Sequence, residues 1–196
     1  DFDNTLISYD QVFFDRALAD DLIPMSLEQT KVAVRNHLRQ AGLEDKWTLL
    51  QGEVYGPGIG GAIPFPGALE ALTRIRSRGI DTCIVSHKTR RPYAGGDHDL
   101  RAAALGWLED NGFFDQTRLV HGPGDVYFES SVKEKAQRVG TLGCSHFVDD
   151  LAEVLEMLPK GVRKIQFAPH VESIDAARWP VLSSWDNLDD FLPESS

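Results

Sequence analysis

The sequence is poor in cysteine and lacks any long apolar run. Only Cys83 and Cys144 occur among 196 residues, so a disulfide framework is not expected, and their spacing fits no metal-binding motif. No stretch reaches the roughly 20 apolar residues that a membrane-spanning helix needs, and no signal peptide is recognisable. These absences favour a cytoplasmic protein in which both thiols are reduced and buried.

Positive charge is also scarce. The 20 Lys and Arg residues stand against 30 Asp and Glu residues, which gives a formal net charge of -10 at pH 7. This balance argues against nucleic acid or an anionic membrane as the main partner, and ordinary solubility accounts for it. The length and the 42% hydrophobic content predict one domain with a sizeable core and a small insertion.

The first five residues, Asp1-Phe2-Asp3-Asn4-Thr5, carry a pattern with chemical meaning. In an extended segment Asp1 and Asp3 point to the same side, because strand side chains alternate. Carboxylates that close repel each other, so a cation lies between them or one keeps its proton. A hard cation such as Mg²⁺ meets the first need. Asp1 as nucleophile and Asp3 as proton donor and acceptor meet the second, although so short a motif also occurs in ordinary turns.

The pattern Asp-x-Asp-x-Thr followed by Leu6 resembles the first motif of the haloacid dehalogenase (HAD) superfamily of phosphatases and phosphotransferases. The resemblance implies three further features in order: a Ser or Thr after a second strand, a Lys at a helix start, and an acidic pair after a fourth strand. It also implies an apolar strand leading into Asp1, so we expect a few residues upstream of it.

Ser86 meets the first of these expectations. Residues 66–78 have the pattern of an amphipathic helix, and residues 80–85 are a short apolar run typical of a buried parallel strand. Ser86 and His87 then follow at the carboxyl end of that strand, where open α/β sheets bind their ligands. We therefore expect both residues to contribute to phosphate binding.

A concentrated basic stretch begins at the same point. It continues through Lys88, Arg90 and Arg91 in an otherwise acidic chain. Two interpretations remain open, a solvated loop and a contact with a second anionic group of the substrate.

The lysine at a helix start has two candidates. Ser130 or Ser131 can cap a helix whose first turns contain Lys133 and Lys135. An ammonium group there can neutralise the phosphate and the nucleophilic carboxylate together. The distance to the following strand favours Lys135, and Lys133 remains an alternative phosphate-binding residue.

Asp149 and Asp150 form the acidic pair. They follow a short strand over residues 145–148 and precede a helix over residues 151–158. Adjacent acids just past a buried strand cost free energy unless they meet a cation or hydrogen-bond donors. Mg²⁺ would be that partner, with Asp149 as a direct ligand and Asp150 either as a ligand or as a group that supports one.

Residues 9–51 are predicted to be helical. Ser26 is the expected N-cap of the second helix, with Gln29 at the capping-box position, and a third helix is expected over residues 44–50. By the resemblance this block is a small cap inserted after the first motif. A helical subdomain without a substrate role is the alternative.

The sequence therefore predicts an α/β fold with a Rossmann-like, mostly parallel sheet and helices on both faces. Residues 1–8 and 52–196 form this core, and residues 9–51 form the cap. Residues 118–121 are the expected third strand, and residues 162–168 the fifth.

By the resemblance, the chain is a Mg²⁺-dependent phosphomonoester hydrolase that acts on a small soluble phosphorylated metabolite. Asp1 attacks phosphorus to form an aspartyl-phosphate, and Asp3 protonates the leaving oxygen and later activates water. Asp1, the backbone carbonyl of Asp3, and Asp149 hold Mg²⁺, while Ser86 and Lys135 hold the phosphate. The alternatives are a phosphotransferase or mutase of the same superfamily and a catalytically silent binding module. The sequence indicates neither the substrate nor the oligomeric state.

Overall fold

The computed structural model describes residues 1–114, 122–169 and 178–193, so the predicted third strand lies outside the described residues. The chain forms two compact units, and each is described by itself. Unit 1 comprises Asp1–Leu6, Pro64–Lys88 and Asn111–Ser196, and unit 2 comprises Ile7–Ile63 and Thr89–Asp110. Unit 2 contains the whole range predicted as a cap and, in addition, residues 7–8, 52–63 and 89–110. The cap role itself stays a prediction.

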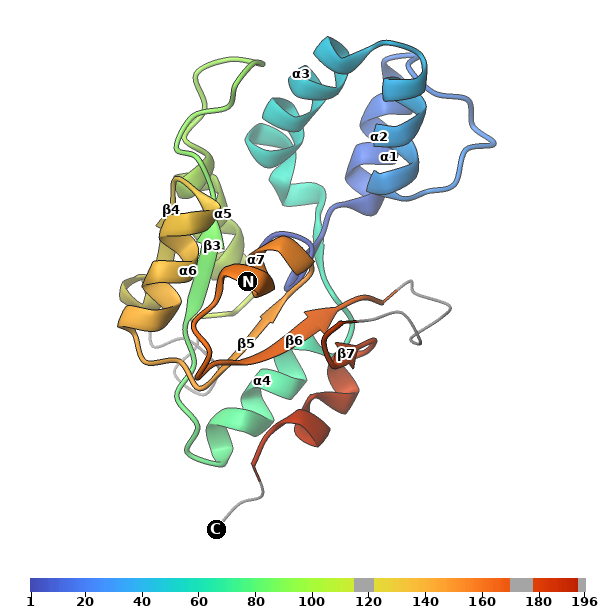
Figure 1. The fold of residues 1–196 in the computed structure, drawn as a ribbon. Coiled ribbons are helices and arrows are strands. Elements are labelled where there is room, and N and C mark those ends of the chain that lie inside the picture. Colours follow the sequence, from blue (N-terminus) through green and yellow to red (C-terminus); the bar gives the residue numbers. More distant parts are fainter. Residues whose placement is uncertain (115–121, 170–177, 194–196) are drawn as a thin grey trace. The chain divides into compact units, whose positions relative to one another are not determined.

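Unit 1 contains two parallel sheets (Figure 1). Strand β3 (Ile84–His87) pairs with β4 (Val126–Glu129). Strand β6 (Arg163–Phe167) lies between β5 (His146–Asp149) and β7 (Val181–Leu182) and is parallel to both. These pairings confirm a mixed α/β fold with parallel strands. A separate two-stranded pairing joins the short β1 (Ile7–Ser8) and β2 (Ile63–Pro64).

The strands differ from the prediction in their bounds. Strand β3 begins at Ile84 and not at Ile80, so Ser86 lies inside the strand and not after it. The reason is the end of the preceding helix: the Ile80 N–H donates to the Ile75 carbonyl at 3.3 Å, and Gly79 adopts φ +74°, so the chain is still closing that helix. Strand β4 differs from the prediction, which places the third strand at residues 118–121 and none at Val126–Glu129.

The helices of unit 1 cover both sheets. Helix α6 (Val132–Thr141) packs against β3, β4 and α7 (Ala152–Met157), and α7 packs against β5 and β6. Helix α4 (Ala68–Ser77) packs against the 3₁₀ helix η3 (Trp185–Phe191). Side chains from β3, α6, β5 and α7 form one apolar cluster, which comprises Val85, Ala136, Val139, Phe147, Val154, Leu155, Leu158 and Val162. One core therefore supports strands of both sheets.

Ser131 is the N-cap of α6. Its Oγ accepts a hydrogen bond from the Glu134 N–H at 3.2 Å, and Glu134 Oε2 accepts one from the Ser130 N–H at 3.1 Å. These reciprocal bonds satisfy backbone donors that the first helical turn leaves unpaired. Of the two predicted serines, Ser131 is thus the cap, and it fixes the start of the helix that carries Lys135.

Unit 2 is helical apart from the short β segments at its borders. Its elements are α1 (Asp10–Ala19), α2 (Lys31–Gln40), α3 (Glu44–Tyr55), the 3₁₀ helix η1 (Pro57–Gly61) and α5 (Leu100–Asp110). Helices α1, α2 and α3 pack on one another, and the rings of Phe13 and Trp47 stack with centroids 4.9 Å apart. Within the described ranges, no helix combines the length and apolar character that crossing a bilayer requires.

The prediction that Ser26 caps the second helix is wrong. The helix begins at Lys31 after Thr30, whose Oγ1 accepts a hydrogen bond from the Ala33 N–H at 3.1 Å. Asp10 Oδ1 accepts from the Lys31 N–H at 2.8 Å. Two side-chain acceptors therefore satisfy the first turn at Thr30, and one of them comes from a distant helix that local sequence does not reveal.

Candidate active site

The first residues lie against the carboxyl end of β5. The Asp1 nitrogen donates to the Val148 carbonyl at 2.9 Å. The chain then turns, because the Leu6 N–H donates to the Phe2 carbonyl at 3.0 Å and Asn4 adopts φ +56°, a conformation that asparagine tolerates. The segment is therefore not extended throughout, and Asp1 and Asp3 form ion pairs with different lysines.

Asp1, Lys135 and Asp149 form a buried ion cluster. Lys135 Nζ lies 2.7 Å from Asp1 Oδ1 and 2.5 Å from Asp149 Oδ2, and all three side chains are at most 4% exposed. Asp149 Oδ1 accepts a hydrogen bond from the Leu151 N–H at 2.9 Å. Buried charges of this kind persist only when each meets an opposite charge or a donor. The cluster thus joins the first residues, the start of α6 and the end of β5.

The excess negative charge of this carboxylate cluster favours the binding of a divalent cation. Carboxylate oxygens of Asp1, Asp149 and Asp150 all lie within 4.8 Å of one another. Asp1 and Asp149 share the ammonium group of Lys135, so these two carboxylates exceed it by one negative charge. Asp1 Oδ1 and Asp149 Oδ2 contact Lys135 Nζ but accept no well-aligned hydrogen bond from the described residues. Clustered carboxylate oxygens are the ligands that Mg²⁺ prefers, so the donor set fits this ion.

A second buried ion pair involves Asp3. Lys88 Nζ lies 3.0 Å from both carboxylate oxygens of Asp3, and the two side chains are 3% and 19% exposed. Lys88 follows Ser86 by two residues, at the carboxyl end of β3, and both are buried. Side chains two apart along a strand share a face, whereas the intervening His87 is exposed. The prediction placed Lys88 only in a basic stretch, because its contact with Asp3 joins residues 85 positions apart and the burial along β3 does not alternate.

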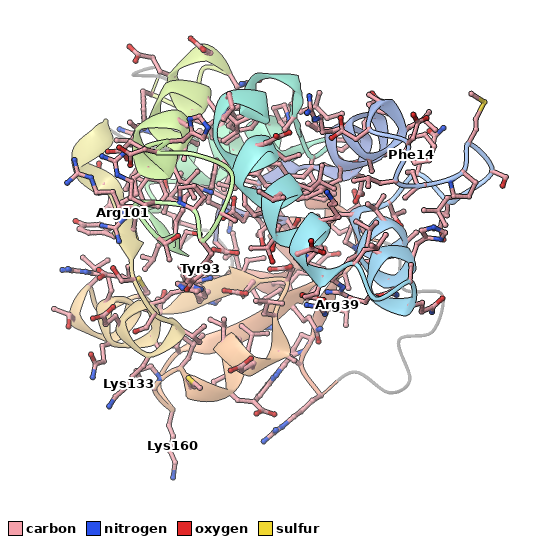
Figure 2. All side chains as sticks on the ribbon, turned by 90° about the horizontal axis from the view of Figure 1, so that it is seen from above. Phe14, Arg39, Tyr93, Arg101, Lys133 and Lys160 are labelled. Carbon is pink, nitrogen blue, oxygen red and sulfur yellow. The ribbon has the colours of Figure 1, made fainter. Side chains whose placement is uncertain are left out.

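The structure brings some predicted residues together and leaves others apart. Lys135 lies in the carboxylate cluster, whereas Lys133, two residues earlier on α6, is exposed and projects into solvent (Figure 2). Residues two apart on a helix point in different directions, so only one of the two lysines can meet the carboxylates. His87 is likewise exposed and lies outside the cluster. Ser86 is buried on β3, on the face that also carries Lys88.

The arrangement can perform group transfer to a carboxylate. Asp1 presents an oxygen that an ammonium group polarises and holds, which suits a nucleophile. Asp3 is a second carboxylate whose orientation Lys88 fixes through both oxygens, which suits a proton donor and acceptor. Two lysines and a divalent cation can offset the charge of an anionic substrate that would otherwise be repelled.

No model of a known protein family matches the chain, and no curated protein sequence matches it. The residues of the site, and the resemblance of residues 1–6 to a phosphatase motif, are therefore what indicates a function.

Proposed function

We propose that the chain is a Mg²⁺-dependent phosphomonoester hydrolase of the HAD type. The single observation that carries the proposal is the buried cluster of Asp1, Lys135 and Asp149, with the carboxylate of Asp150 beside it. A carboxylate that is buried, paired with an ammonium group and adjacent to a cation-binding acid pair is the arrangement that an in-line attack on phosphorus needs.

In this mechanism each residue of the cluster has a separate role. An oxygen of Asp1 attacks the phosphorus atom, and the ester oxygen leaves, so that the phosphoryl group is held on Asp1 as an acyl phosphate. Lys135 offsets the charge that Asp1 and the phosphoryl oxygens share. Asp149 and Asp150 would hold Mg²⁺ together with Asp1, and the bound ion would supply further positive charge at the phosphoryl oxygens.

Asp3 carries out both proton transfers of the reaction. It donates a proton to the leaving oxygen and takes one from the water that later attacks the phosphorus of the acyl phosphate. The paired contacts from Lys88 Nζ hold this carboxylate in one orientation, so Lys88 positions the acid and base. Ser86 is the expected hydroxyl donor to a phosphoryl oxygen.

The proposal also includes the finer fold. We expect the strands of unit 1 to belong to one Rossmann-like layer, since a single apolar cluster contains residues of β3 and β5 and the α6–α7 pair covers both sheets. We expect residues 9–51 to act as a cap that selects a small soluble phosphate ester. The helical content of unit 2 is compatible with this role.

The test is release of inorganic phosphate from a panel of small phosphate esters by the full chain. Each ester is assayed with Mg²⁺ and with EDTA, and the Asp149→Asn and Lys133→Met variants are run in parallel. We expect release that EDTA abolishes, that Asp149→Asn reduces by about a hundredfold or more, and that Lys133→Met leaves unchanged. Equal release with EDTA, or equal rates for Asp149→Asn and wild type, would contradict the proposal.

A further inference from the structure

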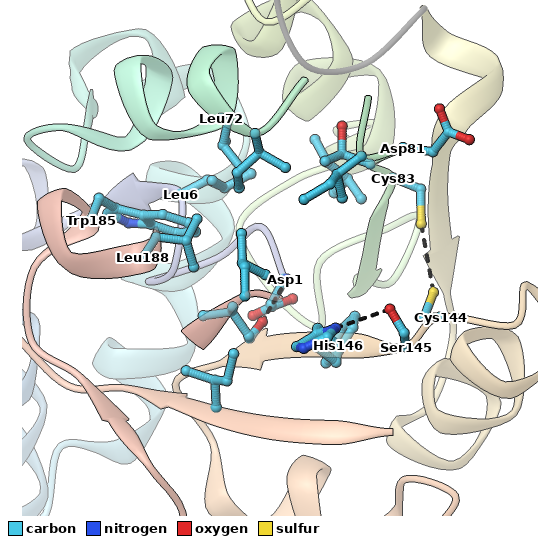
Figure 3. A pocket seen from close by; sticks show the side chains of 18 of the residues that line it. Asp1, Leu6, Leu72, Asp81, Cys83, Cys144, Ser145, His146, Trp185 and Leu188 are labelled. Atoms are coloured by element: carbon cyan, nitrogen blue, oxygen red, sulfur yellow. Dashed lines mark hydrogen bonds between the residues drawn. The ribbon is translucent and has the colours of Figure 1, made fainter. Parts of the chain in front are cut away.

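The two cysteines of the chain lie next to each other. Cys83 Sγ and Cys144 Sγ are 3.9 Å apart although 61 positions separate them in the sequence (Figure 3). Cys83 comes directly before β3, and Cys144 lies two residues before β5. Both are free and half-buried, whereas the sequence predicted fully buried thiols.

The surroundings leave the two sulfur atoms room to move. Both thiols line a cavity of about 170 Å³ in unit 1, whose other walls include Ile84, Phe113 and Phe147. The backbone at both cysteines is irregular, so neither is held by a strand ladder. A disulfide needs the sulfur atoms at about 2.0 Å, and side-chain rotation in a cavity can bring them roughly 2 Å closer.

We propose that Cys83 and Cys144 form a redox-sensitive pair that a small disulfide compound converts to an intrachain disulfide. One protein thiolate attacks a sulfur atom of the compound, and one small thiolate leaves. The second cysteine loses its proton to solvent, and its sulfur displaces the remaining small thiol from the mixed disulfide. The protein gives up two electrons and two protons, and the compound is reduced to two thiols.

The hydrogen bond between the thiols indicates the order of these steps. This bond lowers the pKa of Cys144 to about 7, and the same bond together with burial raises the pKa of Cys83. The thiolate is the attacking form, so Cys144 reacts first and Cys83 resolves the mixed disulfide.

The bridge would join the two sheets at one edge. Cys83 leads into the β3–β4 sheet and Cys144 into the β5–β6–β7 sheet, while the carboxyl ends of β3 and β5 carry Lys88 and Asp149. Asp1 also lines the cavity beside the thiols, but neither cysteine takes part in the ion cluster of Asp1, Lys135 and Asp149, so the modification does not depend on the proposed hydrolase activity.

The test uses the full chain, reduced, desalted and treated with 2-hydroxyethyl disulfide under native conditions. We expect intact mass to fall by about 2 Da, both thiols to become unavailable to an alkylating reagent, and one peptide pair to contain Cys83 joined to Cys144. Dithiothreitol should reverse all three changes. Two stable mixed disulfides, a covalent dimer, or thiols that react only after urea denaturation would overturn the proposal.

Single variants test the order of reaction. Cys83→Ser should accumulate a mixed disulfide at Cys144, and Cys144→Ser should form one at Cys83 more slowly, by about tenfold or more at neutral pH. Equal rates in the two variants would overturn the assignment of Cys144 as the first thiol. The wild-type mass measurement does not depend on either variant folding well.

Discussion

The two ends of strands β3 and β5 carry opposite chemistry. At the carboxyl ends, Lys88 and Asp149 are buried, and each meets an opposite charge from another segment. At the amino ends, Cys83 and Cys144 meet each other beside an apolar cavity. The side chains at one end are held by ion pairs at or below 3.0 Å, and those at the other end have space around them.

This difference separates a preorganised site from an adaptable one. Groups that must stabilise charge during a reaction act best when their orientation is fixed in advance, as Lys135 fixes Asp1. Thiols that exchange partners need to move, and an apolar cavity resists their movement less than a network of ion pairs does. The predictions below test each half of the comparison, from the largest expected effect to the smallest.

Replacement of Asp1, the proposed nucleophile, should have the largest effect. Asp1→Asn replaces one carboxylate oxygen by an amide and removes the charge that Lys135 holds, so phosphate release should fall by about a thousandfold or more. Steady-state assays of the variant and the wild type with the best ester measure the ratio. Retained release in a folded Asp1→Asn protein would rule out this residue as the nucleophile.

Lys135 and Lys133 form a matched pair on one helix. Lys135→Met leaves two buried carboxylates without their ammonium partner, so the free energy of unfolding should drop by about 3–5 kcal/mol. Lys133→Met changes an exposed side chain and should stay within about 0.5 kcal/mol of wild type. Urea unfolding gives both values.

The same pair tests the metal site. Mg²⁺ should restore part of the stability that Lys135→Met loses, because the ion would replace the positive charge that Asp1 and Asp149 no longer meet. An equal stability change in the two variants, or no response of Lys135→Met to Mg²⁺, would contradict the cluster as described.

The Lys88–Asp3 pair should show coupling in a double-mutant cycle. Lys88→Met and Asp3→Asn each remove one side of this ion pair and should each destabilise the protein by about 2–3 kcal/mol, whereas the double variant should lose less than their sum. Urea unfolding of the four proteins gives the coupling energy. Strict additivity would show that the two side chains do not interact in solution.

The reactivity of the two thiols should rise with pH over different ranges. A lowered pKa means ionisation at lower pH, so alkylation of Cys144 should rise through about pH 7 and then level off. The raised pKa of Cys83 keeps it protonated and slow over the same range. Peptide mapping after brief alkylation of the reduced protein measures both rates, and parallel pH profiles would contradict the hydrogen bond between them.

Local sequence patterns predicted many of the helices and strands but fewer of the contacts between distant segments. The helix cap at Ser130 or Ser131 and the strand near Asp149 depend on neighbours in sequence. Ser131 is the cap, and the strand runs over His146–Asp149, one residue later than predicted. The start of α2 depends on Asp10, 21 residues upstream, and was missed. Strand β4 is four residues long and lacks a clear alternating pattern, so its partner β3 decides its conformation.

The site shows the same division between local and distant contacts. Asp1, Lys135 and Asp149 were chosen from motifs in order along the chain, and the structure places them in one cluster. The ion pair between Lys88 and Asp3 and the proximity of the two cysteines join residues 85 and 61 positions apart. The local sequence around each of these four residues does not indicate its partner, because only the packing of the strands brings the two members of each pair together.

The most direct test of the central claim is to trap the acyl phosphate on Asp1. The Asp3→Asn variant keeps the proposed nucleophile but lacks the group that protonates the leaving oxygen and later activates water. With p-nitrophenyl phosphate, whose phenolate leaves without a proton, the first step should proceed and the intermediate should accumulate. After incubation with Mg²⁺ and this ester, borohydride reduction should convert Asp1 to homoserine, which peptide mass spectrometry identifies. Homoserine at position 1 that depends on the ester is the result we predict. Reduction at another residue, or phosphate release by this variant without any label on Asp1, would contradict the account.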